Sequence, residues 1–495
     1  MRPGRIARRA LIPNGTDSMT LNVYNTQTRS VDPFSPLVEG QVGVYACGPT
    51  IYNHAHIGNF RTFLFFDTVH RYLEASGYDV RFVMNLTDVD DKTIAGAIAA
   101  DMSVADFTRP FAEAFFEDSA TLGIRPADCY PRATDYIEKM VDFVAGLVES
   151  GHAYQAEDGA VYFSVASFGA YGRLKGIDTS SLMSGARVAQ DEYEKEDARD
   201  FALWKVASGA DEEAGAAWSS PWGLGRPGWH LECSVMSLTE LGDTLDVHLG
   251  GEDLIFPHHE NEIAQSEAAT GKQFVRYWLH GRHLQLEGRK MSKSLGNYIT
   301  VRELLDEGYD PASIRHQLIS AHYRSDLNFT RAGLDASRNA VQRLVDFEAR
   351  VSGAPVAENA EPTALPALAE EAVRAFLSAM DNDLNTADAL AAAFTMIVRV
   401  NAALDAQPTV LASDRDAVLD ALGQMDQVLG LLEVARAARA IDDDVSAWVE
   451  QKIVERKEAR AAGEYALADA IREELAGKGI VLEDGSAGTR WKVTG

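Results

Sequence analysis

Residues 42–85 place a strand, a turn, a helix and a second strand in close succession, and this succession constrains the fold more than any other part of the sequence. The apolar run VGVYAC ends at Cys47 and breaks at Gly48-Pro49, and a helical pattern then runs from His56 to about Ala75. The strand DVRFVMN (79–85) follows and ends in the acidic turn TDVDD. Two strands joined by a crossover helix pair in parallel, so the segment predicts a doubly wound, Rossmann-like α/β sheet.

The same pattern resumes far downstream. DTLDVHLGG (243–251) predicts a third strand, residues from about 257 to 270 a helix, and FVRYWLHG a fourth strand. Between the two halves, residues 103–150 have a helical pattern and 151–215 are less regular, with Gly/Ser-rich and Gly/Ala/acid stretches. We therefore expect a split catalytic sheet, with its first half at 19–130, a connective insertion at 131–220 and its second half at 221–300.

The chain after residue 300 is largely helical. We expect one helical region at 301–352 and a helical bundle at 353–440, with a Pro/Ala-rich linker at 353–371 between them. From Asp442 a long charged helix, the helix ADAIREELAGKG and the strand pair GIVLED and TRWKV predict a small separate domain at 441–495.

Composition narrows the classes of function. The 495 residues include 46 Lys and Arg against 74 Asp and Glu, a formal net charge of −28. Affinity for phosphate backbones comes from clustered basic side chains, so this balance argues against a protein that coats nucleic acid without specificity, while a local basic patch stays compatible with it. At ordinary domain sizes the length corresponds to about three to four domains.

The sequence predicts neither a secretory signal nor a membrane span. Its apolar runs are shorter than the roughly 18 residues that cross a bilayer, and the 3 cysteines are too few and too widely spaced for a disulfide framework. We expect a soluble, cytoplasmic protein that does not bind membranes. Residues 1–18 are expected to be a disordered extension, with a short basic transit peptide as the alternative.

The segment CGPTIYNHAHIGN (47–59) lies at the turn from strand to helix, where an open α/β sheet binds its ligand. Gly58 lets a ligand approach the backbone, the helix start favours anions, and the His56 imidazole can hydrogen-bond a phosphoryl oxygen. This turn suits a polyphosphate. Taken alone, however, a histidine at a helix start is usually a capping or packing residue.

The loop GRKMSKSLGN (288–297) contains Lys290 and Lys293 beside serine hydroxyls. Two lysines in a loop are usually solvated. The combination with the HIGN turn resembles the class I aminoacyl-tRNA synthetases, which have a HIGH-type turn early in the chain and a KMSKS loop after the split sheet.

A third group of residues suits a metal. Cys47 ends the first strand, Cys233 lies in PGWHLECSVM, and His258 and Glu262 lie four apart on one helix face. Two thiolates, an imidazole and a carboxylate can bind zinc, although each could also be an ordinary buried or surface residue. His259 is a rival ligand, because it is three residues from Glu262.

Together, YACGPTIY, GWHLECS and GGEDLIFPHHENE resemble the cysteine-specific family of these synthetases from about Leu21 to the C-terminus. The resemblance implies one zinc ion per chain, which takes the thiolate of the substrate cysteine, and Mg²⁺ accompanying ATP. The zinc ligands that it implies are Cys47, Cys233, His258 and Glu262. The catalytic residues that it implies are His56, Asn59, Lys290 and Lys293, and Asn59 departs from the histidine of the general motif.

The resemblance also assigns the two substrate pockets. The residues that it assigns to ATP are Gly58, Gly250, Asp253 and Lys293. For the amino acid it implies Thr87 and Trp229, although Trp229 could equally be a core residue. Cys129 matches no ligand motif and is expected to be a structural thiol.

The C-terminal segment provides candidate tRNA contacts. Lys452, Arg456 and Arg460 are spaced four apart along a helix, which predicts a basic stripe. The alternative is that these basic side chains form an ordinary solvated face on which they alternate with glutamates. Arg490 and Trp491 suit stacking with splayed bases, and the family's C-terminal domains bind the anticodon.

The resemblance therefore implies a monomeric ligase that uses ATP to convert L-cysteine into cysteinyl adenylate and then transfers it to the 3′ end of tRNA(Cys). It also implies that residues 301–352 contact the tRNA stem and residues 441–495 bind the anticodon. Two rivals stay open. One is a ligase that joins cysteine to an amino-sugar inositol, and the other is a non-catalytic RNA-binding paralogue with the same fold.

Overall fold

The computed structural model describes residues 20–177, 199–291, 298–462, 464–476, 480–485 and 488–493. The expected extension at 1–18, a middle part of the expected insertion and Lys293 of the KMSKS loop lie outside these residues.

A four-stranded parallel sheet forms the centre of the fold, in the order β11-β10-β3-β4. Its strands are β3 (Gln41–Ala46), β4 (Asp79–Met84), β10 (Leu245–Gly251) and β11 (Val275–Gly281). The expectation of a split, doubly wound sheet is confirmed, because β3 from the first half pairs directly with β10 from the second. The register places Ala46 beside Leu249, so the carboxyl ends of the two halves meet at one edge.

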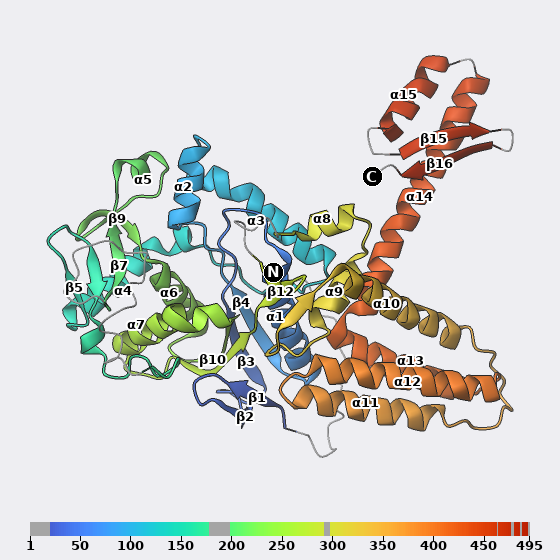
Figure 1. Cartoon of the computed structure of the whole chain (residues 1–495), viewed down its shortest axis with the longest axis horizontal. Helices are drawn as coiled ribbons and strands as arrows, with labels where there is room; N and C mark the ends of the chain where they lie inside the picture. Colours follow the sequence, from blue (N-terminus) through green and yellow to red (C-terminus); the bar gives the residue numbers. More distant parts are fainter. Residues whose placement is uncertain are drawn as a thin grey trace.

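Alternation along the strands creates two apolar cores. Val44 and Ala46 pack on one face with α1 (Ile57–Ala75), whereas Tyr45 and Cys47 face the opposite layer, which contains α6 (Trp229–Leu241) and α7 (Glu260–Thr270). The core on the α1 face continues into the C-terminal helices. Figure 1 shows α6 and α7 on one side of the sheet and α1 on the other.

The insertion contains a five-stranded antiparallel sheet where the sequence predicted a less regular region. Its order is β5-β6-β7-β9-β8, and the pairs in it are antiparallel. The strands are β5 (Ala153–Gln155), β6 (Val161–Phe163), β7 (Phe201–Val206), β8 (Trp218–Ser220) and β9 (Gly223–Pro227). Most are too short to show a period of two, and the pairing of β6 with β7 has a register shift at Val161, so alternation alone does not reveal them.

Helices and short strands complete the first part of the chain. The helices are α2 (Asp91–Ala99), α3 (Val104–Thr121), α4 (Ile137–Glu149) and α5 (Gly209–Glu213). The short strands are β1 (Asn22–Asn25), β2 (Ser30–Pro33), β12 (Leu284–Leu286), β13 (Arg289–Lys290) and β14 (Leu327–Phe329).

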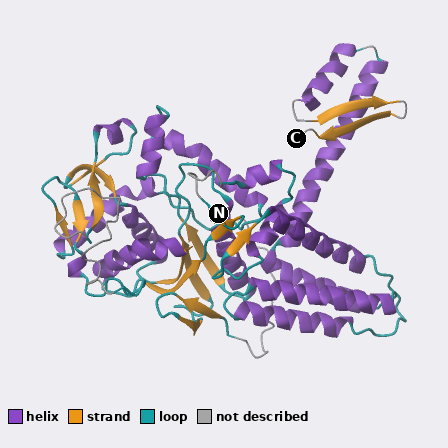
Figure 2. Ribbon diagram, in the orientation of Figure 1, coloured by secondary structure: helices purple, strands orange, loops and turns teal. Residues whose placement is uncertain are grey.

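The C-terminal part is helical, as Figure 2 shows. Its helices are α8 (Val301–Asp306), α9 (Pro311–Ile319), α10 (Arg331–Ser352), α11 (Leu365–Asp381), α12 (Thr386–Ala406) and α13 (Ala412–Leu429). Helix α11 begins inside the stretch expected to be a linker, and a proline in its first turn suits that start.

The long helix α14 (Leu431–Ala461) runs through residues 440 and 441 without a break. It extends away from the bundle and leads to α15 (Tyr465–Ala476) and the hairpin of β15 (Ile480–Gly485) and β16 (Gly488–Val493) (Figure 1). The helix and strand pair predicted for this segment are present, and β15 and β16 pair antiparallel.

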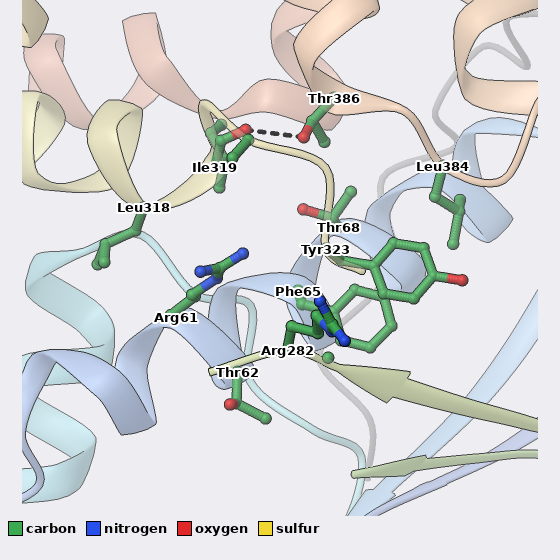
Figure 3. A pocket seen from close by; sticks show the side chains of 12 residues that line it. Arg61, Thr62, Phe65, Thr68, Arg282, Leu318, Ile319, Tyr323, Leu384 and Thr386 are labelled. Atoms are coloured by element: carbon green, nitrogen blue, oxygen red, sulfur yellow. Dashed lines mark hydrogen bonds between the residues drawn. The ribbon is translucent and has the colours of Figure 1, made fainter. Parts of the chain in front are cut away.

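Helix α1 also contacts the C-terminal helices. Figure 3 shows a small pocket between α1, the end of α9 and the start of α12. The Phe65 ring of α1 stacks on Tyr323 with 4.2 Å between ring centroids, and Thr386 Oγ1 donates a hydrogen bond to Ile319 O at 2.7 Å. Helix α1 is therefore packed directly against the bundle.

One helix of the described chain, α12, is long and apolar enough to cross a membrane by length and composition, with a mean hydropathy of 1.4. It packs between α11, α10 and α13. A core helix of a water-soluble protein satisfies the same criterion, so this helix is weak evidence for a membrane span.

Candidate active site

A deep pocket opens at the carboxyl edge of the parallel sheet, where the two halves meet. It leaves about 460 Å³ accessible to water-sized molecules. The predicted site residues that line it are Cys47, His56, Asn59, Thr87, Trp229, Cys233, Asp253 and His258. This is the edge at which open α/β sheets bind ligands.

The HIGN residues form the first turn of α1. His56 is the N-cap: its Nδ1 accepts a hydrogen bond from Asn59 N at 3.0 Å, and Asn59 Oδ1 accepts one from His56 N at 3.1 Å. This is a capping box made by histidine and asparagine. Because Nδ1 is an acceptor, the neutral imidazole has its proton on Nε2 and can donate from there. The capping role explains why asparagine suits position 59.

Gly58 supports this turn by its small size. A Cβ at this position would lie 2.7 Å from Met291 Cε and 3.0 Å from the His56 ring. Met291 belongs to the KMSKS segment and also lines the pocket. Lys290 lies at the end of β13, opposite Gln285 of β12, and Lys293 lies outside the described residues. The start of the KMSKS segment is therefore packed against the HIGN turn.

Three of the predicted metal ligands, Cys47, Cys233 and His258, line the same pocket, and Glu262 lies beside them. Cys47 Sγ lies 3.9 Å from Cys233 Sγ and 4.0 Å from Glu262 Oε1, and His258 Nε2 lies 3.0 Å from the same carboxylate oxygen. All four side chains are buried. Thiolates bound 2.3 Å from a tetrahedral zinc lie roughly 3.8 Å apart, so the two sulfurs have the spacing that zinc requires.

His259 belongs to the same cluster. Its Nε2 lies 3.3 Å from Cys47 Sγ, and the donor atoms of Cys47, His258, His259 and Glu262 lie within 4.8 Å of one another. Each of the two histidines points Nε2 into the cluster and places Nδ1 near another histidine. His258 Nδ1 lies 3.0 Å from His230 Nδ1. His259 Nδ1 lies 2.7 Å from His280 Nε2. The outer contact on Nδ1 is typical of metal-binding histidines.

Electrostatics act differently on the members of this cluster. Burial opposes protonation of His258, but Glu262 and Cys233 outweigh it and raise the pKa of His258 to about 10. Burial raises the pKa of the Cys47 thiol well above its ordinary value. Burial opposes ionisation of the Glu262 carboxyl, but His248 and His258 outweigh it and lower its pKa to about 2. The hydrogen bond from the Cys47 thiol lowers the pKa of Cys233 below its ordinary value. Burial lowers the pKa of His259 well below its ordinary value. Glu262 therefore supplies a carboxylate, Cys233 a thiolate and His259 a neutral imidazole, whereas His258 and Cys47 favour their protonated forms in the absence of a metal.

Two further histidines beside the cluster, His248 and His280, were not predicted from the sequence. His248 Nε2 lies 2.9 Å from Glu262 Oε2, and His280 Nδ1 lies 2.7 Å from Thr26 Oγ1. Both lie in buried strands, β10 and β11. A histidine inside an otherwise apolar strand is the sequence feature that could have identified them, because a buried polar group needs a partner. His248 contacts the Glu262 carboxylate and His280 contacts Nδ1 of His259, so each orients a member of the cluster.

The remaining predicted residues have different surroundings. Trp229 is half-buried, and its ring lies 4.2 Å from the His258 ring on the pocket wall. Thr87 Oγ1 accepts a hydrogen bond from Asn85 at 3.1 Å. Gly250 does not line the pocket; a side chain there would overlap the His259 ring. The absence of a side chain at Gly250 therefore leaves room for the His259 ring.

The basic side chains of the predicted stripe on α14 are largely paired with carboxylates of the protein or buried. Lys452 Nζ lies 3.2 Å from Glu455 and 3.1 Å from Glu474, and Arg456 is buried. Arg490 and Trp491 lie in β16, across from Glu483 and Leu482 in the hairpin register. Both the outer part of α14 and β16 lie away from the parallel sheet that contains the pocket (Figure 1).

Comparisons with known proteins find relatives along most of the chain. Residues 33–339 match the family model of the tRNA synthetases class I (C) catalytic domain, and residues 375–433 match the DALR domain. A cysteine–tRNA ligase of Solibacter usitatus is 46% identical over 96% of this chain and 100% of its own length. One of Chlamydia pneumoniae is 45% identical over 95% of this chain and 98% of its own length.

Solved structures share the fold at low identity. The methionyl-tRNA synthetase of Mycobacterium tuberculosis, bound by methionyl-adenylate, has a TM-score of 0.56 at 17% identity and covers 79% of this chain and 90% of its own. A LeuRS of Agrobacterium radiobacter K84, in a ternary complex with tRNA and LeuAMS, has a TM-score of 0.58 at 12% identity over 81% of this chain and 86% of its own.

Proposed function

The chain belongs to the cysteine–tRNA ligase family of class I aminoacyl-tRNA synthetases, and we propose that it activates L-cysteine with ATP and transfers it to the 3′ end of tRNA(Cys). A carboxylate oxygen of cysteine attacks the α-phosphorus of ATP, and the bond to the β-phosphate oxygen breaks to release pyrophosphate. The terminal ribose hydroxyl of the tRNA then attacks the carbonyl carbon, and AMP leaves.

The observation that carries this proposal is the arrangement of one pocket. The capped start of α1 and residues of the buried Cys/His/Glu cluster line this one pocket. A phosphate site and a thiol site thus face the same space. Joining a carboxylate to an α-phosphate requires both reactants to be held within reach of each other, and positioning of this kind provides much of the rate enhancement in phosphoryl and acyl transfer.

The residues at the start of α1 stabilise the negative charge that develops on the phosphates during the reaction. His56 Nε2 and the free N–H groups at the start of α1 can donate to phosphoryl oxygens, and the helix dipole adds to their effect. Asn59 holds the His56 ring through the capping box. We assign Lys290 and Lys293 to the pyrophosphate and Asp253 to the nucleoside, with Mg²⁺ accompanying ATP.

We assign the metal site to Cys47, Cys233, His258 and Glu262, with His259 as the alternative imidazole. Bound zinc would supply a soft Lewis acid that accepts a substrate thiolate far better than a serine hydroxyl. His248 orients the Glu262 carboxylate, and Trp229 packs against the His258 ring. We assign Thr87 and Trp229 to the rest of the amino acid.

The C-terminal parts suit a long RNA. We propose that residues 301–352 contact the tRNA stem and that the unit at 441–495 binds the anticodon, with Lys452, Arg456, Arg460, Arg490 and Trp491 as candidate contacts. In support, α14 has 31 residues, which at 1.5 Å per residue spans about 46 Å. Since Lys452 is paired with carboxylates, RNA binding there would have to displace them. We further propose a monomeric, cytoplasmic enzyme, in line with three unpaired cysteines.

Two assays test the function. Purified protein should catalyse cysteine-dependent exchange of pyrophosphate into ATP and should charge tRNA(Cys) with cysteine much faster than with serine. Exchange without charging of tRNA would instead indicate the ligase for an amino-sugar inositol, which the DALR match and the full-length relatives already disfavour. RNA binding without exchange would indicate a non-catalytic paralogue.

A further inference from the structure

Lys92 is a cation in the pocket wall to which neither the family motifs nor the assignments above give a role. It lies in the second position of α2, just after the acidic turn that follows β4. Asp90 caps this helix and accepts a hydrogen bond from Lys92 N at 2.9 Å. The backbone of Lys92 is therefore held at the carboxyl edge of the sheet, and its side chain lines the same pocket as His56 and Trp229.

The Lys92 ammonium is positioned by an aromatic ring. Its Nζ lies 5.3 Å from the centre of the Tyr52 ring, which belongs to the loop between β3 and α1. Tyr52 also lines the pocket. A cation–π contact orients a lysine without neutralising its charge, so the positive charge stays available to a ligand.

The nearest acidic residue in the chain is already engaged elsewhere. Asp91 pairs with Lys205 at 3.2 Å and with Arg226. In the part of the chain that the structure describes, no carboxylate lies within 4.0 Å of Lys92 Nζ. This is notable in a protein of net charge −28, in which many basic side chains are paired. An uncompensated ammonium in a pocket attracts anions.

We propose that Lys92 binds a substrate phosphate in this pocket, either an oxygen of the ATP triphosphate or the phosphodiester before the terminal nucleotide of tRNA. The proposal rests on the proposed function, because it takes ATP and tRNA as the substrates. A lysine ammonium is a common phosphate ligand, and its flexible stem allows it to follow the phosphate during the reaction.

The test compares Lys92→Met, which removes the charge and keeps most of the length, with Lys92→Arg, which keeps the charge. Lys139→Met is the matched control: Lys139 Nζ lies 4.8 Å from the Tyr136 ring, an equivalent cation–π contact at a position that does not line the pocket. The readouts are the kcat and KM for ATP in pyrophosphate exchange, the single-turnover rate of transfer from preformed adenylate to tRNA, and the Tm.

A loss of 10-fold or more in exchange for Lys92→Met, with partial recovery in Lys92→Arg and an unchanged Tm, identifies the ATP phosphates. Normal exchange with a similar loss confined to transfer identifies the tRNA phosphodiester. Rates within 2-fold of Lys139→Met in both assays would overturn the proposal. Failure of the proposed function is distinguished by the unaltered protein, which would then be inactive in both assays.

Discussion

Arg315 and Asp67 form a completely buried ion pair, with Arg315 Nη2 2.6 Å from Asp67 Oδ2. Arg71 lies 2.8 Å from the same carboxylate oxygen and reaches Glu433 at the start of α14. Arg315 also donates to Leu429 O at 2.6 Å. One carboxylate on α1 thus connects the helix that begins in the active site with α9 and with the base of the helix that leads to the C-terminal unit.

We expect Asp67→Asn to destabilise the protein strongly, because it leaves two buried guanidinium groups without their shared counter-charge. Removing one partner of a buried pair typically costs about 3–5 kcal/mol. The measurement is urea unfolding of both proteins. Glu370→Gln is the control: it breaks an exposed pair with Arg374, and we expect a change below about 1 kcal/mol. Equal effects of the two substitutions would contradict the assigned role of Asp67.

The same carboxylate predicts a pH dependence. Burial opposes its ionisation, but Arg71 and Arg315 outweigh burial and lower the pKa of Asp67 from 3.8 to about 2. A group whose pKa is lower in the folded state contributes stability above the unfolded pKa and loses it as the pH falls through the folded pKa. The difference in unfolding free energy between the unaltered protein and Asp67→Asn should therefore narrow between about pH 4 and pH 2. A constant difference over that range would show that Asp67 does not titrate as described.

Substitution of the metal ligands should change the choice of amino acid. We expect Cys233→Ala and His258→Ala to lose zinc and to weaken activation of cysteine far more than that of serine, because only a thiolate binds zinc strongly. Zinc content and both exchange rates should be measured on the same preparations. A zinc-free variant that still strongly preferred cysteine would refute selection by the metal.

His259→Ala separates the two candidate imidazoles. If His258 is the ligand, His259→Ala should retain most of its zinc, since His259 would not bind the metal directly. The reverse result, in which His258→Ala keeps zinc and His259→Ala loses it, would assign His259 as the ligand. Zinc content after dialysis is the measurement.

A protein ending at residue 440 should retain activation and lose most charging of tRNA. Such a protein keeps Glu433 and the ion pair between Arg436 and Glu348, so the base of α14 stays attached to the bundle. It lacks the rest of α14 and the whole C-terminal unit. Pyrophosphate exchange and charging should be compared with those of the full chain, and full charging by the shortened protein would contradict anticodon binding by residues 441–495.

Much of this protein could be predicted from local patterns in the sequence. The strands and helix of residues 42–85, the capping position of His56 and the final helix and hairpin depend on interactions within a few residues, so periodicity and capping residues reveal them. The four predicted ligands, Cys47, Cys233, His258 and Glu262, were identified because they occur in motifs, and their buried side chains lie close together in the structure. The short strands of the insertion escaped prediction because a strand of three residues has too few positions to show alternation.

The tertiary structure alone decided which side chains meet across long separations. His248 and His280 support the cluster only because β10 and β11 pair beside β3, and Lys92 faces the pocket only because α2 starts at the same sheet edge. Tertiary packing also decides how exposed the charge of the predicted basic stripe is, because α15 packs on α14 and brings Glu474 next to Lys452. Burial and pairing depend on neighbours that are distant in sequence, and a local pattern contains no information about them.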